Sequence, residues 1–223
     1  NVSSDEIAQM VAHAKAYTEL GATPQTIVDK IDLAGGIVEF TDKAPMSAKS
    51  ARAGQSVRVQ AWPDGELIPL TLADWDAKAG TICLVVQGMG TTSLNINKMQ
   101  IGEAFTGIAG PLGQPSELHQ YDAEKETVVF TAGGVGLPPV YPIAREHLRL
   151  GNHVTLISGF RNANLLFWVG EDERMGQLKA EFGDQLDLIY ATNDGSVGVQ
   201  GFVTTPLEAM LKANQAGKGR PIA

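Results

Sequence analysis

The second half of the chain alternates short apolar runs with helical patterns, and this alternation constrains the fold more than any other feature of the sequence. Apolar or β-branched runs lie at 127–131, 154–158 and 186–191, and helical patterns lie at 138–150, 174–182 and 205–212. Strands that alternate with helices form βαβ units around a parallel sheet. We therefore expect an open parallel α/β domain over residues 119–223.

The residues before this region have a different texture. Short alternating or β-branched runs lie at 26–31, 36–40, 56–62, 67–72 and 81–86, separated by turn signals such as Pro63-Asp64-Gly65. This pattern is typical of an antiparallel barrel or sandwich. We expect an N-terminal antiparallel β-barrel domain over residues 25–118 and, before it, a helical extension over residues 1–24.

The composition excludes several classes of function. The 223 residues include 17 basic and 25 acidic side chains, which gives a formal net charge of −8. Nucleic acids and anionic membranes attract positively charged surfaces, so neither is the expected partner. The single cysteine, Cys83, cannot form an internal disulfide, and no apolar run reaches the roughly 20 residues that cross a bilayer. We expect a protein of the reducing cytoplasm, with no metal site formed by its scattered histidines.

A glycine-rich turn follows the first strand of the predicted parallel sheet. Residues 127–131 lead into Gly133-Gly134-Val135-Gly136 and then into a helix that starts near Pro138. In such an arrangement, backbone N–H groups and a helix N-terminus can approach a pyrophosphate. Pro139 stands where the common dinucleotide-binding fingerprint has its third glycine. The turn indicates nucleotide binding, and the alternative is a tight turn without a ligand.

Further candidate residues follow the other strands. Arg161 comes after the second parallel strand, where common NAD sites place an acidic residue on the ribose 2′-hydroxyl. A guanidinium can instead bind a 2′-phosphate, so Arg161 favours NADP; the alternative is an ordinary surface arginine. Asp194-Gly195-Ser196 follows the third strand, at the sheet edge where open α/β proteins bind ligands. In the first half, Gly90-Thr91-Thr92 offers N–H and hydroxyl donors for a second phosphate-bearing ligand.

The order of these motifs resembles that of the ferredoxin–NADP reductase superfamily. The shared motifs are Pro69-Leu70-Thr71, Gly88-Met89-Gly90-Thr91-Thr92, Gly110-Pro111-Leu112-Gly113, Gly133–Pro138, Gly159-Phe160-Arg161 and Asp194–Thr204. The resemblance extends over residues 25–223. It is greatest to the branch that contains the dihydroorotate dehydrogenase electron-transfer subunit, the sulfide dehydrogenase small subunit and the small subunit of NADH-dependent reduced ferredoxin:NADP oxidoreductase.

The resemblance implies FAD on the β-barrel and a pyridine nucleotide, NADP or NAD, on the α/β domain. It implies that Pro69-Leu70-Thr71 lines the flavin ring, with the Thr71 hydroxyl near the flavin N5 that exchanges hydride, and that Gly90-Thr91-Thr92 holds the FAD pyrophosphate. On the α/β domain, Gly134, Gly136 and Pro138 would seat the nicotinamide nucleotide. Arg161 would bind its adenosine phosphate, and Asp194-Gly195-Ser196 would shape the same pocket.

The chain departs from the family pattern at three places. Many members have an arginine just before the Pro-Leu-Thr stretch that neutralises the FAD phosphate, but Leu67 and Ile68 stand there. Leu70 replaces an aromatic residue that usually stacks on the flavin. The branch also has a C-terminal cysteine cluster for a [2Fe-2S] centre, which this chain lacks. We therefore expect the α/β domain to be truncated, and the iron–sulfur centre to lie in a segment after Ala223 or on a partner.

Together these features predict a flavoprotein electron-transfer subunit. It would move a hydride between NAD(P)H and FAD and pass single electrons to an iron–sulfur centre, to a larger flavin and iron–sulfur subunit, or to ferredoxin. Hydride transfer between two cofactors needs no catalytic acid or base from the protein, and the sequence offers no such pair. Two alternatives stay open: a stand-alone NAD(P)H:acceptor reductase, and a non-catalytic docking module that has lost FAD together with the missing arginine.

Overall fold

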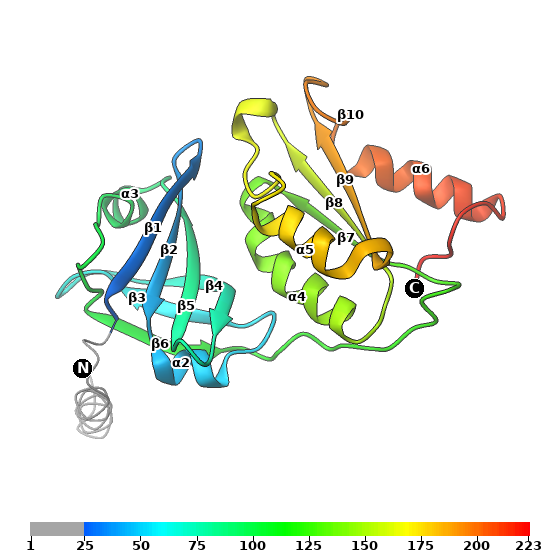
Figure 1. The fold of residues 1–223 in the computed structure, drawn as a ribbon. Helices are drawn as coiled ribbons and strands as arrows, with labels where there is room; N and C mark the ends of the chain where they lie inside the picture. Colours follow the sequence, from blue (N-terminus) through cyan, green and yellow to red (C-terminus); the bar gives the residue numbers. More distant parts are fainter. Residues whose placement is uncertain (1–24) are drawn as a thin grey trace.

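The computed structural model describes residues 25–223, and the predicted extension over residues 1–24 lies outside them. An antiparallel sheet and a parallel sheet lie side by side and are joined by a long connection (Figure 1). We refer to residues 25–112 as the β unit and to residues 128–223 as the α/β unit. None of the helices within residues 25–223 combines the length and the apolar character that crossing a bilayer requires.

The β unit consists of antiparallel strands with two short helices. The strands are β1 (Ile27–Ala34), β2 (Ile37–Lys43), β3 (Ser56–Gln60), β4 (Leu67–Asp76), β5 (Thr81–Gln87) and β6 (Gly107–Leu112), and the helices are α2 (Pro45–Ser50) and α3 (Thr91–Ile96). The strand order is β1-β2-β5-β4-β3-β6. The antiparallel architecture that the alternating sequence pattern predicts is thus confirmed.

Strand β4 folds this sheet over on itself. Its first half, from Leu67 to Thr71, pairs with β3, and its second half, from Leu72 to Asp76, pairs with β5. A register shift between Leu72 and Asp74 separates the two pairings, and such bulges bend a strand. The bend allows the two halves of the sheet to enclose one apolar core, in which Phe40 packs edge-on against Phe105.

Strand pairing does not close this sheet into a barrel. Strands β1 and β6 are the two ends of the strand order, and no ladder joins them within residues 25–223. The segment after α3 lies along β1 instead, where Thr26 pairs with Ala104 in an isolated bridge and the Ile27 N–H donates to the Glu103 carbonyl at 2.8 Å. The predicted barrel is therefore a folded-over sheet whose end strands are not paired with each other.

The α/β unit has the predicted parallel sheet with helices on both faces. The strands are β7 (Val128–Gly133), β8 (Val154–Phe160), β9 (Leu186–Thr192) and β10 (Val199–Gln200), in the order β10-β9-β8-β7. Helices α4 (Leu137–Arg149) and α5 (Arg174–Phe182) lie on the face toward the β unit, and α6 (Thr204–Gln215) lies on the other face (Figure 1). Every residue of β8 is buried, as expected of a strand in the middle of a covered parallel sheet.

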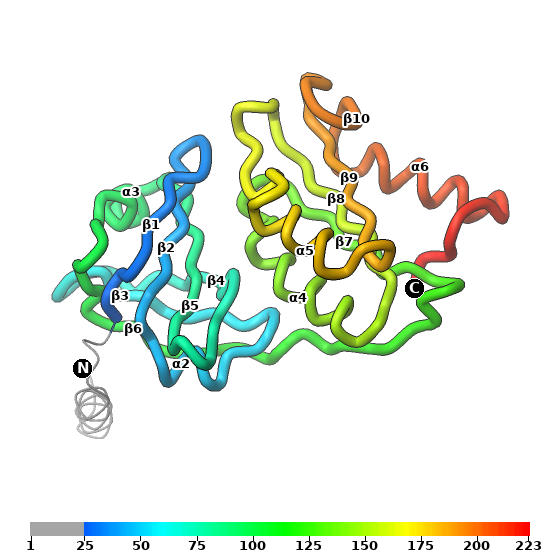
Figure 2. Tube along the Cα trace, viewed as in Figure 1, coloured from blue at the N-terminus to red at the C-terminus, as the bar shows by residue number. Residues whose placement is uncertain are grey.

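The two units share one apolar cluster. Ile37, Ala73 and Cys83 of the β unit pack in the same cluster as Tyr141 and Trp168 of the α/β unit. Helix α4 contacts β4 as well as its own sheet, and Figure 2 shows it between the two sets of strands. The units are therefore joined by a packed interface as well as by the connection between β6 and β7.

Candidate functional site

A cavity of about 340 Å³ opens between the two units. The β unit contributes Gly35, Ile37 and Gln87 to its lining. The α/β unit contributes the remaining residues, which come from the strand ends and the loops that follow them: Gly133, Gly134, Val135, Gly159, Phe160, Arg161, Leu165, Asn193, Phe202 and Val203. The cavity thus lies at the carboxyl edge of the parallel sheet, where open α/β proteins bind their ligands.

The glycine-rich turn forms one wall of this cavity. Gly133 ends β7, and the single-turn helix η1 (Gly134–Gly136) leads into α4. Gly134 has a φ of 49°, a left-handed backbone conformation that would be strained in a residue with a side chain. A Cβ placed on Gly134 or on its neighbour Gly133 would meet no atom within 4 Å. The turn therefore presents bare backbone to the cavity, as contact with a phosphate or a nicotinamide ribose requires.

The predicted residues of this turn divide into two groups. Gly134 lines the cavity, whereas Gly136 and Pro138 do not. Gly136 is the N-cap of α4, and Pro138 is buried in its first turn, where a missing N–H costs nothing. Gly136 and Pro138 therefore shape the start of the helix, and the sequence did not single out Gly133 and Val135 as separate lining residues.

Arg161 lies at the end of β8, in the cavity lining and with an exposed side chain. Within residues 25–223, its guanidinium has no ion-pair or hydrogen-bond partner, so its donors are free for a ligand. Two residues earlier, a Cβ on Gly159 would lie 2.4 Å from Val203 Cγ1. Glycine at this position therefore makes room for the Val203 side chain of the loop after β10, at this edge of the cavity.

The predicted Asp194-Gly195-Ser196 segment stands beside the cavity. None of these three residues lines the cavity, whereas the preceding Asn193 does. The Ser196 hydroxyl donates to the Asp194 carboxylate at 2.6 Å and accepts the Ala163 N–H at 2.8 Å. The hydrogen bonds from the Ser196 side chain and backbone lower the pKa of Asp194. These residues tie their loop to the short helix η2 (Ala163–Leu165), whose last residue, Leu165, does line the cavity.

The predicted flavin residues lie on β4, outside the cavity lining. Facing residues in the β3–β4 ladder are Val57 with Leu70 and Arg58 with Pro69. Because side chains alternate along a strand, Pro69 and Thr71 share the outer face with Arg58, whereas Leu70 packs against the core that contains Val57. The structure therefore places Pro69 and Thr71 together and Leu70 on the opposite face.

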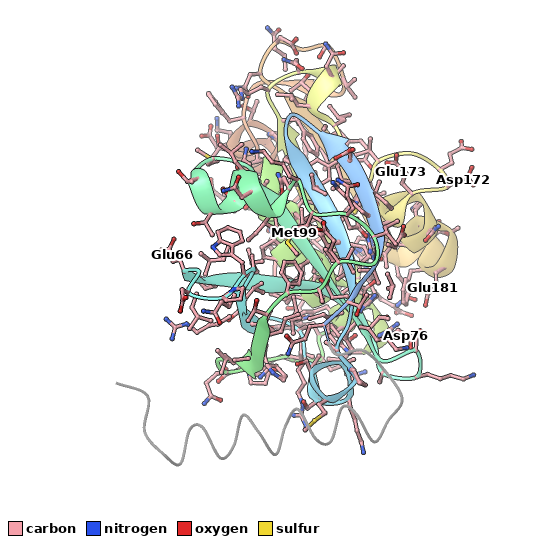
Figure 3. All side chains as sticks on the ribbon, turned by 90° about the vertical axis from the view of Figure 1, so that its left-hand side faces the viewer. Glu66, Asp76, Met99, Asp172, Glu173 and Glu181 are labelled. Atoms are coloured by element: carbon pink, nitrogen blue, oxygen red, sulfur yellow. The ribbon has the colours of Figure 1, made fainter. Side chains whose placement is uncertain are left out.

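The second phosphate candidate, Gly90-Thr91-Thr92, forms the start of α3. The Ser93 hydroxyl accepts the N–H groups of Met89 and Gly90, each at 3.0 Å, so these two donors are occupied. The Thr92 hydroxyl donates to Glu66 Oε2 at 3.1 Å, which ties α3 to the residue just before β4. Figure 3 shows Glu66 projecting at the margin of the β unit, below α3. The two sets of predicted flavin residues therefore belong to neighbouring elements.

Sequence reasoning did not identify the β-unit side of the cavity. Gly35 lies in the turn between β1 and β2, Ile37 begins β2, and Gln87 ends β5, directly before Gly88-Met89-Gly90. Only the position of Gln87 beside that turn could have been noticed in the sequence. Phe202, which lines the cavity and is 67% exposed, lies in the glycine-rich loop after β9, and no local pattern marks it there as a lining residue.

Comparison with known proteins gives relatives of one kind. No family model matches the chain. The electron-transfer subunit homologue of dihydroorotate dehydrogenase B from Thermotoga maritima is 32% identical over 192 residues, which cover 86% of this chain and 63% of the relative. The chain thus spans less than two thirds of the length of this relative.

Solved structures agree with this relationship. The NADH-dependent reduced ferredoxin–NADP oxidoreductase, described in connection with flavin-based electron bifurcation, matches with a TM-score of 0.75 and 31% identity, over 86% of this chain and 64% of that one. Ferredoxin–NADP⁺ reductase from Plasmodium falciparum, at 11% identity and a TM-score of 0.65 over 84% of this chain and 79% of that one, shares the fold. With the motif order and the cavity between the two sheets, these similarities show that the chain belongs to the ferredoxin–NADP reductase superfamily.

Proposed function

We propose that the chain is the flavin- and nicotinamide-binding part of an electron-transfer subunit, which moves a hydride between NAD(P)H and FAD. The observation that carries the proposal is the cavity between the two units. One wall is the bare glycine turn with Arg161, which has no ion-pair partner within residues 25–223, and the other includes Gln87, which leads directly into Gly88-Met89-Gly90. Such a site can hold a pyridine nucleotide beside a second ligand bound to the β unit.

On the α/β unit, each predicted residue has a distinct role. The bare backbone of Gly134 would contact the nicotinamide nucleotide, and Gly136 with Pro138 would hold the turn at the start of α4. Arg161 would bind a 2′-phosphate on the adenosine, since its donors have no partner among the residues that the structure describes. Asp194-Gly195-Ser196 would hold η2 in place and, with it, the Leu165 side of the cavity.

The β unit has groups that fit FAD. Leu67, Met89 and Leu94 are large apolar side chains with exposures of 46%, 78% and 49%, close to β4 and α3. Soluble proteins seldom leave such groups exposed together without a ligand or partner. Pro69 and Thr71 would line the flavin ring, with the Thr71 hydroxyl as a donor near the reacting edge, and Leu70 would support this strand from the core side. Gly90-Thr91-Thr92 would hold the pyrophosphate through the backbone N–H groups of Thr91 and Thr92 and the Thr91 hydroxyl, because the Gly90 N–H and the Thr92 hydroxyl already have partners.

Bound FAD would supply the redox chemistry, accepting a hydride and releasing electrons singly. The chain's own residues orient the two cofactors and exclude water between them. We propose that the electrons leave for a [2Fe-2S] centre outside residues 1–223, or for a larger flavin and iron–sulfur subunit, with ferredoxin as a further acceptor. The names of the relatives, which are electron-transfer subunits, support a partner of this kind. We place this activity in the cytoplasm, where the lone buried Cys83 stays reduced.

An anaerobic titration tests the proposed function. The purified protein is incubated with FAD, freed of excess, and titrated separately with NADPH and NADH while the flavin absorbance is recorded. A yellow protein that one nucleotide bleaches supports the proposal and ranks the two donors. Turnover of a soluble acceptor without any partner would instead favour a stand-alone reductase.

Two outcomes contradict the proposal. A protein that stays colourless after incubation with FAD binds no flavin and would be a docking module, in keeping with Leu67 and Ile68 in place of the family arginine. A yellow protein that neither nucleotide reduces would retain the flavin site but not the hydride step.

A further inference from the structure

We infer that Glu39, Asp74, Arg145 and Arg174, here called the arginine–carboxylate cluster, set the orientation of the two units and thereby the geometry of the cavity between them. The four are positioning residues, since none of them lines the cavity. The consequence for hydride transfer rests on the proposed function. The consequence for the arrangement of the units does not.

The cluster joins the units through two arginines and two carboxylates. Arg174, the first residue of α5, donates to Asp74 Oδ2 on β4 at 2.6 Å and also forms an ion pair with Glu39 on β2. Arg145 on α4 donates to the other carboxylate oxygen, Asp74 Oδ1, at 2.7 Å. Asp74 is therefore held by two helices of the α/β unit at once. Among the ion pairs within residues 25–223, only those of this cluster connect the two units.

Burial makes this arrangement selective. The Glu39 side chain is 6% exposed and the Arg145 side chain 10%. Trp168 Nε1 also donates to Glu39, at 2.7 Å, and the Arg174 guanidinium stacks 4.9 Å from the Trp168 ring. A rotation of one unit against the other would leave buried charges without partners, which is unfavourable. The cluster therefore favours one orientation of the β unit relative to the α/β unit over slightly rotated orientations.

The Arg174 guanidinium keeps its positive charge in this buried position. Burial by itself would lower the pKa of Arg174, but the charges of Glu39 and Asp74 and the hydrogen bond to Glu39 outweigh burial and raise that pKa above its usual value. Burial is also the main reason why the pKa of the Cys83 thiol lies well above its usual value, so this neighbour stays neutral. The arginine therefore remains a cation, and its fork of donors can hold both carboxylates at once.

Two continuous routes lead from the cluster to the cavity. On the β unit, Ile37 lines the cavity, and Glu39 lies two residues further along the same face of β2, roughly 7 Å away by strand geometry. On the α/β unit, three aromatic rings form a row. Phe160, in the cavity lining, packs edge-on against Phe167 with ring centroids 5.5 Å apart, and Phe167 packs against Trp168 at 5.6 Å. Both walls of the cavity are thus packed onto the cluster.

The test combines a distance with a rate. Spin labels on Asp32→Cys and Asn164→Cys, two exposed positions on opposite units near the cavity, report the separation by pulsed electron paramagnetic resonance. Cys83 is 4% exposed and should not take up the label. We expect Arg174→Met to broaden or shift the distance distribution in the FAD-free protein. In the FAD-loaded protein, the rate of flavin reduction at saturating nucleotide should fall roughly 10- to 100-fold, because small misplacements of reacting groups are costly.

Positioning is distinguished from binding by comparing these effects. The dissociation constants of FAD and of the nucleotide should stay within about threefold of the unsubstituted values, so that the effect lies in kcat and not in KM. The long-wavelength charge-transfer absorbance of the stacked nicotinamide and flavin should weaken in parallel, and Arg174→Lys should restore part of both signals. Arg149→Met is the matched control, because its exposed pair with Glu146 lies within α4.

A folded Arg174→Met protein with an unchanged distance distribution and an unchanged rate overturns the inference. If this variant does not fold, Glu39→Gln tests the same cluster, since it removes one charge and keeps the shape of the side chain. If the unsubstituted protein binds no FAD or is not reduced, the proposed function fails. The distance measurement in the FAD-free protein still decides whether the cluster orients the units.

Discussion

Asp42 places a carboxyl group in the apolar core of the β unit. It is fully buried on β2 between Ile27 and Ile82, and neither of its oxygens has a hydrogen-bond partner among residues 25–223. Burial raises the pKa of this carboxyl well above its usual value of 3.8. The folded state therefore binds the proton more tightly than the unfolded state. The contribution of protonated Asp42 to the free energy of unfolding is complete below pH 3.8 and is lost as the pH rises through the raised pKa.

We predict that Asp42→Asn raises the free energy of unfolding near neutral pH and changes it little near pH 4. A gain of about 1–3 kcal/mol is the scale for relieving an unfavourably buried polar group. Urea unfolding of both proteins across this pH range measures the effect. Asp76→Asn serves as a control that should lower the free energy of unfolding near neutral pH, because hydrogen bonds from the Ala79 and Lys78 backbones lower the pKa of Asp76. Equal stability of the Asp42→Asn and unsubstituted proteins at neutral pH would contradict the prediction.

Arg161 is the residue on which the choice of nucleotide depends. Its side chain lines the cavity and lacks a partner among the described residues. The 2′-phosphate that it would bind is the group that distinguishes NADPH from NADH. We predict that Arg161→Ala raises the KM for NADPH about tenfold or more while the KM for NADH changes little, since charge-assisted bonds to the phosphate are lost. Steady-state kinetics with both nucleotides measures the difference. Equal increases for the two nucleotides would remove the 2′-phosphate assignment.

At the scale of the elements, the outer face of the β3–β4 hairpin offers a replacement for the family arginine. Leu67 faces Gln60 across the ladder, and Arg58 lies two residues along β3 from Gln60, so both side chains belong to this face. Arg58 is exposed and has no ion-pair partner within residues 25–223. It is therefore free to neutralise a phosphate of FAD near β4.

We predict that Arg58→Leu weakens FAD binding about tenfold, the scale of one charge-assisted contact, and that Leu67→Arg tightens it by a similar factor. The double variant should bind FAD nearly as the unsubstituted chain does. Equilibrium dialysis with FAD measures all of these constants. Lys49→Leu removes a positive charge from α2 elsewhere on the β unit and should have no effect. If Arg58→Leu binds FAD as tightly as this control does, Arg58 does not contact the cofactor.

The helices and strands also show which local patterns predict structure. The helix predicted over residues 174–182 is observed as Arg174–Phe182, and the last predicted helix continues beyond residue 212 to Gln215. Strand β6 (Gly107–Leu112) was missed because two glycines and Pro111 are typical of a turn. Its pairing with β3 depends on the partner strand, which no local pattern records.

At the scale of the whole molecule, the sequence predicted two kinds of sheet but not how they meet. The arginine–carboxylate cluster joins residues far apart in the chain: Arg174 lies 100 positions from Asp74 and 135 from Glu39. Before folding, Arg174 is one of several arginines and Glu39 one of many acids. Only the packing of α4 and α5 against β2 and β4 makes their charges buried and mutually dependent.

The sequence by itself determined the two sheet types, the glycine turn after β7 and Arg161 at the end of β8, because periodicity, turn residues and strand ends are local properties of the chain. Tertiary structure alone decided that Gly35, Ile37 and Gln87 complete the cavity, that Leu70 faces the core while Pro69 and Thr71 do not, and that strand pairing leaves β1 and β6 apart. These features depend on strand register and on contacts between residues far apart in the chain. Such contacts form only when apolar faces and buried charges find their partners in three dimensions.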